Sequence, residues 1–136
     1  AEEEASILER NENENPVRSL QPVLTTADIA ALQDEVKKVS AAANVKNYIV
    51  DIVNATRNDE AIKLGVSPRG SIALYKAAKA WAFINERSFI TPDDVRHCAV
   101  SVLSHRIMLS PKGKAEYGSA ENVIGQVISR INVPVE

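Results

Sequence analysis

Residues 67–84 read SPRGSIALYKAAKAWAFI, and this stretch decides the fold. Ser67 is of a residue type favoured at a helix N-cap, and Pro68 suits the first helical position because its missing N–H costs nothing there. Apolar residues follow almost all round the helix, and a helix of that kind is expected to be central and buried. They are Ile72, Leu74, Tyr75, Ala77, Ala78, Trp81, Ala82 and Ile84. The sequence therefore predicts a central helix from Pro68 to Glu86.

The first turn of this predicted helix carries an unusual charge. Arg69 would lie against the positive end of the helix dipole, which costs about 0.3–1 kcal/mol. Gly70 follows, and glycine is a poorer helix former than alanine by about 1 kcal/mol. A second cap-plus-proline start, residues 91–94, instead places Asp93 and Asp94 where the dipole favours carboxylates. A cation and a glycine at a helix start indicate a place for an anion. The alternative is an exposed arginine paired with an acidic neighbour, and the local sequence favours neither.

Other segments show the apolar spacing of amphipathic helices. They cover residues 2–12, 25–40, 44–58 and 92–105, and a last helix begins after Ser119. In the second of these, Thr25 and Asp28 form a capping box ahead of a narrow apolar seam: Ile29, Leu32, Val36 and Val39. We expect residues 106–109 to pair as a small strand with residues 23–24, and a loop through Pro111, Gly113 and Gly118. The expected fold class is therefore all-α, a helical bundle with at most a short two-stranded hairpin.

Composition bounds the class of protein. At 136 residues with 45% hydrophobic content, the chain is expected to form one globular domain with an aliphatic core. Residues 1–15 carry six glutamates and one arginine, whereas the remainder of the chain has a net charge of +3. This positive charge is too small to indicate nucleic-acid binding, which usually shows a strongly basic surface. The single cysteine, Cys98, excludes an intramolecular disulfide and is expected to be a buried structural thiol. No apolar run reaches membrane-spanning length, so we expect a cytoplasmic location and no membrane partner. The absence of an initiator methionine suggests a piece of a longer protein.

Recognisable catalytic chemistry is absent from the sequence. There is no glycine-rich phosphate loop and no apolar run ending in paired acids for magnesium. His97 and His105 have no carboxylate or thiol pattern that would complete a metal site. We therefore expect no catalytic residue and no metal site in this chain, and no catalysis by the chain alone.

Residues 45–109 resemble the C-terminal lid of the MoxR family of AAA+ ATPases and, more distantly, that of magnesium-chelatase ATPase subunits. The order and spacing of the matching pieces carry the resemblance, which extends more loosely over most of the chain. The pieces are Tyr48-Ile49-Val50, Ala55-Thr56-Arg57, residues 64–70 (LGVSPRG), Ala77-Ala78-Lys79-Ala80, residues 87–95 (RSFITPDDV) and residues 102–107 (VLSHRI). Glu86 departs from the family, which usually has a glycine before that arginine.

The resemblance implies a domain arrangement. Residues 1–15 would be an acidic helix and polar linker near the hinge, and residues 16–136 the helical lid, with a pre-sensor-2-like helix at about 25–40. A nucleotide-binding core would precede them in the parent protein, which would be an ATP hydrolase using ATP and Mg²⁺. The core would hold the Mg²⁺, and the fragment alone would bind neither.

The resemblance also implies a site and a function. Arg69 would be the sensor-2 residue that contacts the terminal phosphate of ATP, while Ser67, Pro68 and Gly70 shape the helix start. Lys76 would extend the positive charge of Arg69 toward the nucleotide, although a role as a solvated surface residue is favoured. Arg57 would lie at the core–lid junction, and the alternative is that it only caps its helix. The lid would close over ATP and couple hydrolysis to chaperone-like remodelling or metal insertion. The implied partners are the missing core, other copies in a homo-oligomeric, hexameric ring, and a von Willebrand factor A-type protein.

Two other readings stay open from the sequence. One is a non-catalytic helical protein-interaction module, in which the Ser-Pro-Arg run is only a helix start. The other is a helical DNA-binding domain, which is disfavoured because the basic residues are dispersed rather than gathered on one recognition helix.

Overall fold

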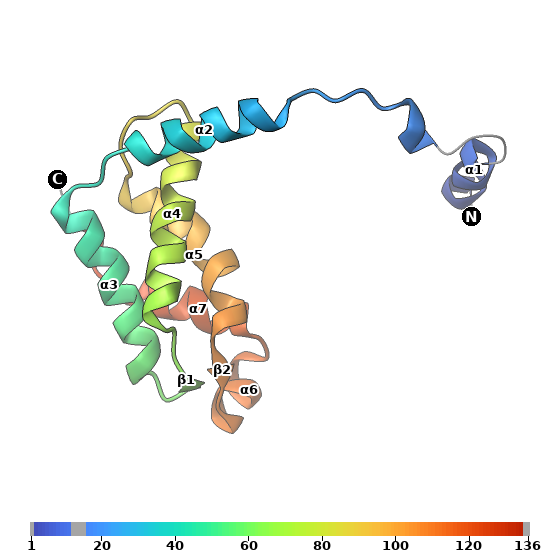
Figure 1. Ribbon diagram of the computed structural model, residues 1–136. Helices are drawn as coiled ribbons and strands as arrows, with labels where there is room; N and C mark the ends of the chain where they lie inside the picture. The colour runs from blue at the N-terminus through green and yellow to red at the C-terminus, as the bar shows by residue number, and fades with distance from the viewer. Residues whose placement is uncertain (1, 12–15, 135–136) are drawn as a thin grey trace. The chain divides into compact units, whose positions relative to one another are not determined.

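A computed structural model describes residues 2–11 and 16–134 of the chain. The chain divides into two compact units, Ala1–Gln33 and Asp34–Glu136. Figure 1 shows the course of the ribbon through both. Each unit is described by itself below.

The first unit is helical. It contains α1 (Glu2–Asn11), a short 3₁₀ turn η1 (Pro16–Ser19) and the beginning of α2 (Thr26–Lys38). The predicted capping box is present, since the Asp28 backbone N–H donates to the Thr25 hydroxyl at 3.1 Å and the Thr25 N–H donates back to the Asp28 carboxylate at 2.8 Å. The predicted helices at 2–12 and 25–40 are thus confirmed over their described residues. Part of the predicted polar linker, residues 12–15, lies outside the described part of the chain.

The second unit is a bundle of four longer helices. They are α3 (Ala43–Asn58), α4 (Pro68–Ile84), α5 (Pro92–Leu103) and α7 (Ala120–Ser129), and the bounds of all four confirm the predicted helices to within a few residues. Helix α4 packs most extensively along α5, with α3 beside it, and α7 contacts both α3 and α5 (Figure 1). The aliphatic core at their centre includes Ile52, Val53, Leu74, Ala78, Val95, Ala99, Leu103 and Ile124. The predicted all-α fold with one small hairpin is correct.

The hairpin does not form where the sequence predicted it. Strand β2 (Met108–Leu109) pairs antiparallel with β1 (Ile62–Leu64), not with residues 23–24, which form no strand. Burial explains this pairing, because Ile62 lies in a small apolar cluster with Ala61, Val123 and Val127, and Leu109 packs against it.

The predicted loop through Pro111 and Gly118 was also wrong. Residues Pro111–Tyr117 form a further helix, α6, which begins after the short 3₁₀ turn η2 (Ser104–Arg106) and β2. Ser110 caps it by accepting the Gly113 N–H at 3.0 Å, and Gly118 ends it at φ 74°. Gly113 is a packing residue rather than a loop residue, because a Cβ there would lie 2.1 Å from the Ala61 carbonyl oxygen.

Helix α4 is not buried all round, contrary to prediction. Leu74, Ala78 and Ala82 are buried, but the side chains of Ile72 and Ile84 are 56% and 69% exposed. Cys98 is half-buried rather than fully buried as predicted, and this burial raises the pKa of its thiol, which disfavours a reactive thiolate. Among the described residues, no helix is long and apolar enough to cross a bilayer.

Candidate functional site

The candidate site is the start of α4. Ser67 occupies the N-cap position with extended backbone, and Pro68 is the first helical residue, as predicted. The Gly70 N–H donates to the Ser67 carbonyl oxygen at 2.8 Å. The Ser67 hydroxyl makes no capping hydrogen bond, so Ser67 sets the backbone turn rather than satisfying the helix end with its side chain.

The loop before this helix is fixed by the end of α3. The Val66 N–H donates to the hydroxyl of Thr56 at 3.0 Å, and that hydroxyl in turn donates to the Val53 carbonyl oxygen at 2.6 Å. The Val66 carbonyl oxygen accepts from Nε of Arg57 at 2.8 Å. Both backbone polar groups of Val66 are therefore bonded to α3. Thr56 was not singled out from the sequence, and only its place one residue before Arg57 in the matching Ala-Thr-Arg run pointed to it.

Two glycines allow this loop to lie close to its neighbours. A Cβ on Gly65 would lie 2.7 Å from the Thr56 carbonyl oxygen and 2.7 Å from Cα of Arg57. A Cβ on Gly70 would lie 2.1 Å from Cγ1 of Val66. Gly70 is therefore explained by its contact with Val66, and its presence alone is not a sign of an anion site.

Arg69 is exposed at this fixed helix start. Its guanidinium forms no hydrogen bond or ion pair with any residue that the structure describes, so the alternative of an acidic neighbour paired with Arg69 finds no support there. Helix α4 has no acidic residue along its length, and its free N-terminal N–H groups lie in the same turn. A guanidinium and a helix N-terminus together favour a phosphate or another anion.

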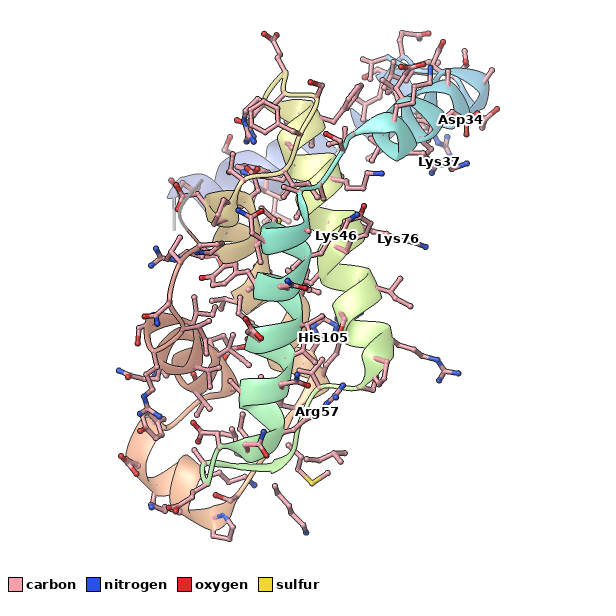
Figure 2. The ribbon with its side chains drawn as sticks, turned by 90° about the vertical axis from the view of Figure 1, so that its left-hand side faces the viewer. Asp34, Lys37, Lys46, Arg57, Lys76 and His105 are labelled. Atoms are coloured by element: carbon pink, nitrogen blue, oxygen red, sulfur yellow. The ribbon has the colours of Figure 1, made fainter. Side chains whose placement is uncertain are left out.

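The other predicted cations of the region differ in what they contact. Arg57 bonds the Val66 carbonyl and, at 3.2 Å, the Asn54 side chain, which gives it a structural role; a part in binding stays a prediction. Lys76 is exposed on α4, at about the level of Lys46 on α3 (Figure 2). Lys79 donates to the Lys37 carbonyl oxygen at 2.5 Å, so it is partly engaged in packing.

The start of α5 shows the contrasting arrangement. Asp94 completes a capping box with Thr91, accepting its N–H at 2.7 Å, and forms a two-pronged ion pair with the guanidinium of Arg87. Burial raises the pKa of the Asp94 carboxyl, but the hydrogen bonds from Arg87 and Thr91 outweigh it and hold that pKa below its ordinary value. The interpretation of Asp93 and Asp94 as helix-start carboxylates is confirmed. Arg87, which lies seven residues before Asp94, was not anticipated as its partner.

His105 lies beside this site, because Cδ of its neighbour Arg106 is 3.5 Å from the position that a Cβ on Gly70 would take. The ring of His97 stacks on Trp81 with centroids 3.8 Å apart, and His105 contacts the guanidinium of Arg106. Over the described ranges, no group of three His, Cys, Asp or Glu side chains is arranged to hold a metal ion.

The fold, a helical bundle with one small two-stranded sheet in the described part of the chain, is that of an AAA lid domain. The family model described as "AAA lid domain" matches residues 54–127, and the chain belongs to this family, with the MoxR-type lids as its relatives. It is 43% identical over 134 residues to "Uncharacterized protein YeaC" of Bacillus subtilis (strain 168), covering 98% of this chain and 42% of that protein.

Two further relatives agree. The chain is 30% identical over 121 residues to "Chaperone MoxR1" of Mycobacterium tuberculosis, covering 82% of this chain and 32% of that protein. A crystal structure from Cytophaga hutchinsonii, described as a "putative ATPase", superposes with a TM-score of 0.82 at 29% identity, covering 98% of this chain and 43% of that chain. The chain thus spans less than half the length of the relatives it matches.

Proposed function

We propose that this chain is the lid of a MoxR-type ATPase and closes over ATP that is bound by a core elsewhere in the parent protein. Arg69 is its sensor-2 residue and contacts the terminal phosphate. The core supplies the phosphate loop and holds Mg²⁺. Membership of the lid family and the printed descriptions of the relatives as a chaperone and an ATPase support this proposal.

The observation that carries the proposal is that the Arg69 side chain is exposed and has no ion-pair partner among the residues that the structure describes. An arginine at a helix N-terminus is unfavourable by about 0.3–1 kcal/mol unless an anion joins it. Here the helix start is fixed by Thr56 and Arg57 through Val66, so Arg69 is presented from a rigid base. A guanidinium held in this way suits bidentate contact with phosphate oxygens. Lys76 adds positive charge two turns further along the same side of α4.

The parent protein, in this proposal, is a homo-oligomeric, hexameric ring. Its hydrolysis cycle moves the lids and so drives chaperone-like remodelling of, or metal insertion into, a partner such as a von Willebrand factor A-type protein. The pre-sensor-2-like helix at about 25–40 swings the lid toward the neighbouring subunit, so that Arg69 acts on that subunit's ATP.

Removal of the guanidinium tests the assignment. In the parent protein, Arg69→Ala is expected to slow ATP hydrolysis by about 10²-fold, the size of effect seen when one preorganised donor is lost from a charged transition state. The matched control is Arg96→Ala, which removes an exposed arginine from α5. Thermal stability of the 136-residue chain should be unchanged by Arg96→Ala and should hold or rise slightly with Arg69→Ala, because the unfavourable contact with the helix dipole is removed. A wild-type hydrolysis rate for Arg69→Ala would show that Arg69 does not contact the nucleotide.

Mixed rings test action between subunits. Subunits carrying Arg69→Ala are combined with subunits whose phosphate-loop lysine is removed. Action on the neighbour's ATP predicts activity above that of either mutant alone, because some interfaces then contain both intact elements. Action within one subunit predicts no recovery at any mixing ratio.

A further inference from the structure

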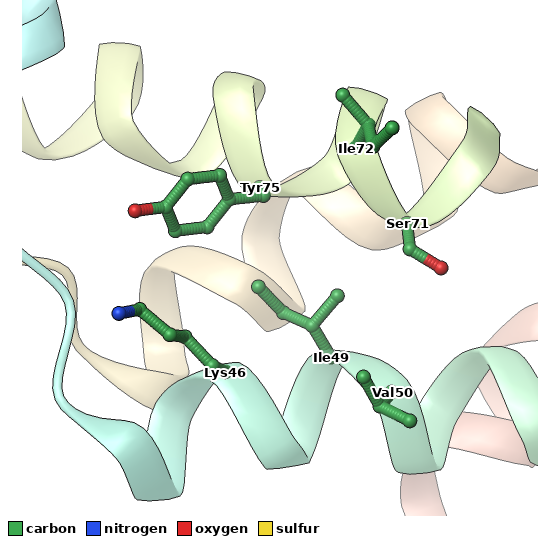
Figure 3. Close-up of a pocket in the computed structure, with 6 residues that line it drawn as sticks. All are labelled: Lys46, Ile49, Val50, Ser71, Ile72 and Tyr75. Atoms are coloured by element: carbon green, nitrogen blue, oxygen red, sulfur yellow. The ribbon is translucent and has the colours of Figure 1, made fainter. Parts of the chain in front are cut away.

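A shallow groove runs between α3 and α4, next to the candidate site. It has a volume of about 290 Å³ and is lined by Lys46, Ile49 and Val50 from α3 and by Ser71, Ile72 and Tyr75 from α4. In Figure 3 the Ile49 side chain and the Tyr75 ring lie between the two helices, and the Lys46 ammonium lies at the same end of the groove as the tyrosine hydroxyl. The groove is open and slightly smaller than typical ligand cavities of roughly 300–1,000 Å³, so it suits a row of side chains better than an enclosed small molecule.

Large apolar side chains stand exposed along this groove. Ile72 is 56% exposed and Val50 is 48% exposed, and they line the groove from α4 and α3 respectively. Contiguous exposed apolar surface with a polar border is typical of a protein interaction site. The close approach of Gly70 to Val66 and the bond from Arg57 to Val66 join the start of α4 to the end of α3, at one end of this helix pair.

The charged side chain that lines the groove and those of α4 beside it are lysines. Helix α4 has no acidic residue and carries Lys76 and Lys79 beside the groove, with the Lys79 ammonium 5.5 Å from the centroid of the Tyr75 ring. Lys46 completes the cationic border. The one carboxylate of α3, Asp51, is five residues from Lys46 and so lies about 140° away around the helix axis.

We propose that this groove binds an acidic amphipathic helix from a partner protein. Aliphatic side chains spaced at i, i+3, i+4 and i+7 would fill the groove, as in other helix-in-groove complexes. Glutamates on either side of them would face Lys46, Lys76 and Lys79, which gives orientation and a fast encounter. A third helix lying between α3 and α4 extends the packing mode that the bundle already uses. The proposal goes beyond nucleotide sensing and does not depend on the role of Arg69.

The test uses the 136-residue chain and a labelled probe peptide without nucleotide. The probe is an amphipathic peptide of about 15 residues, long enough to be partly helical, with leucines on one face and glutamates elsewhere. Fluorescence anisotropy should show saturable binding that weakens in about 0.5 M salt, which screens the charges. Two control peptides, with lysine replacing each glutamate or serine replacing each leucine, should bind about tenfold more weakly or not at all.

Substitutions inside and outside the groove test whether the peptide binds there. Ile72→Asp and Lys46→Glu should each weaken binding of the acidic peptide by about tenfold. Ile84→Asp and Lys63→Glu, which change exposed residues outside the groove, should leave it unchanged. Because Ile72 is exposed, the fold should survive; Ile72→Ser offers a milder change if the aspartate variant unfolds.

Three results would overturn the proposal. One is peptide binding that the groove variants do not alter. Another is tighter binding of a duplex DNA probe, lost with Lys46→Glu, which would assign the groove to nucleic acid. The last is self-association of the chain that Ile72→Asp abolishes, which would assign the groove to a second copy.

Discussion

Nε of Arg57, in the last turn of α3, donates a 2.8 Å hydrogen bond to the carbonyl oxygen of Val66, three residues before Arg69. Thr56 binds the N–H of the same residue from the other side. The start of α4 is therefore positioned by the end of the preceding helix and not by its own capping side chain, because the Ser67 hydroxyl makes no cap bond. The direction in which Arg69 projects thus depends on contacts that lie far from its own side chain.

The bond from Arg57 should contribute measurably to stability. Arg57→Ala leaves the Val66 carbonyl oxygen without its donor, and we expect the free energy of unfolding to fall by about 1–2 kcal/mol. Arg57→Lys should recover only part of this, because one ammonium cannot reproduce the separate bonds to Val66 and Asn54. Urea unfolding of the chain gives the comparison, with Arg96→Ala as the exposed-arginine control. An unchanged midpoint for Arg57→Ala would show that the loop is held without this bond.

Close packing at Gly70 predicts an overpacking effect. Gly70→Ala would place a methyl group 2.1 Å from Cγ1 of Val66, so we expect a loss of about 1–3 kcal/mol despite the better helix propensity of alanine. Adding Val66→Ala should relieve the clash, so that the double variant is more stable than the sum of the single effects predicts. Gly125→Ala in α7 is the control, because nothing lies within 4 Å of its Cβ position and stability should rise by up to about 1 kcal/mol. Equal effects at both glycines would contradict the packing explanation.

Local signals were sufficient to predict most of the helices. Three of these signals act within one helical turn and are therefore visible in the sequence. They are the cap-plus-proline pairs before α4 and α5 and the capping box at Thr25. The same signal, Ser110-Pro111, begins α6, but Gly113 made that segment look like a loop. The need for this glycine arises from the Ala61 carbonyl, fifty-two residues earlier in the chain, and no local pattern reveals it.

Long-range contacts account for the remaining differences. The pairing of β1 with β2 depends on the apolar cluster around Val123, which becomes visible only when α7 is in place. Arg69 was identifiable from its conflict with the helix dipole, and the resemblance supplied its proposed role. The attachment of its loop to Thr56, and the exposure of Ile72 on a helix that reads as apolar all round, required the packing itself.

Backbone strain at Glu86 predicts a stabilising substitution. Glu86 has φ 58° at the turn after α4, in the left-handed region that disfavours residues with a Cβ. Glycine adopts this backbone conformation without the steric cost of a Cβ, so Glu86→Gly should raise the free energy of unfolding by about 1 kcal/mol. Asn85→Gly, at φ −90°, removes a side chain without relieving strain and should not stabilise. Thermal unfolding of both variants gives the comparison, and a loss of stability with Glu86→Gly would mean that its side chain matters more than its backbone.

The buried pair of Asp94 and Arg87 predicts how stability depends on pH. The pKa of Asp94 is lower in the folded chain than the ordinary aspartate value of about 3.9, which applies when the chain is unfolded. Folding therefore favours the ionised form, and the carboxylate's contribution to stability is fully present above about pH 4–5. It is lost as the pH falls through the lower folded-state pKa, because the unfolded chain takes up the proton first.

Asp94→Asn isolates this contribution, because other carboxylates titrate alike in both proteins. At pH 7 the variant should be less stable by about 2–4 kcal/mol, since Arg87 is left without its partner and Thr91 loses its capping carboxylate. The difference in unfolding free energy between wild type and variant should stay constant from about pH 7 to 5 and shrink below about pH 4. Asp93→Asn is the control, an exposed first-turn carboxylate whose loss should cost only about 0.3–1 kcal/mol. Urea unfolding across this pH range gives both curves. A difference for Asp94→Asn that persists undiminished to pH 2, or that grows on acidification, would show that the ionised carboxylate is not what the folded chain stabilises.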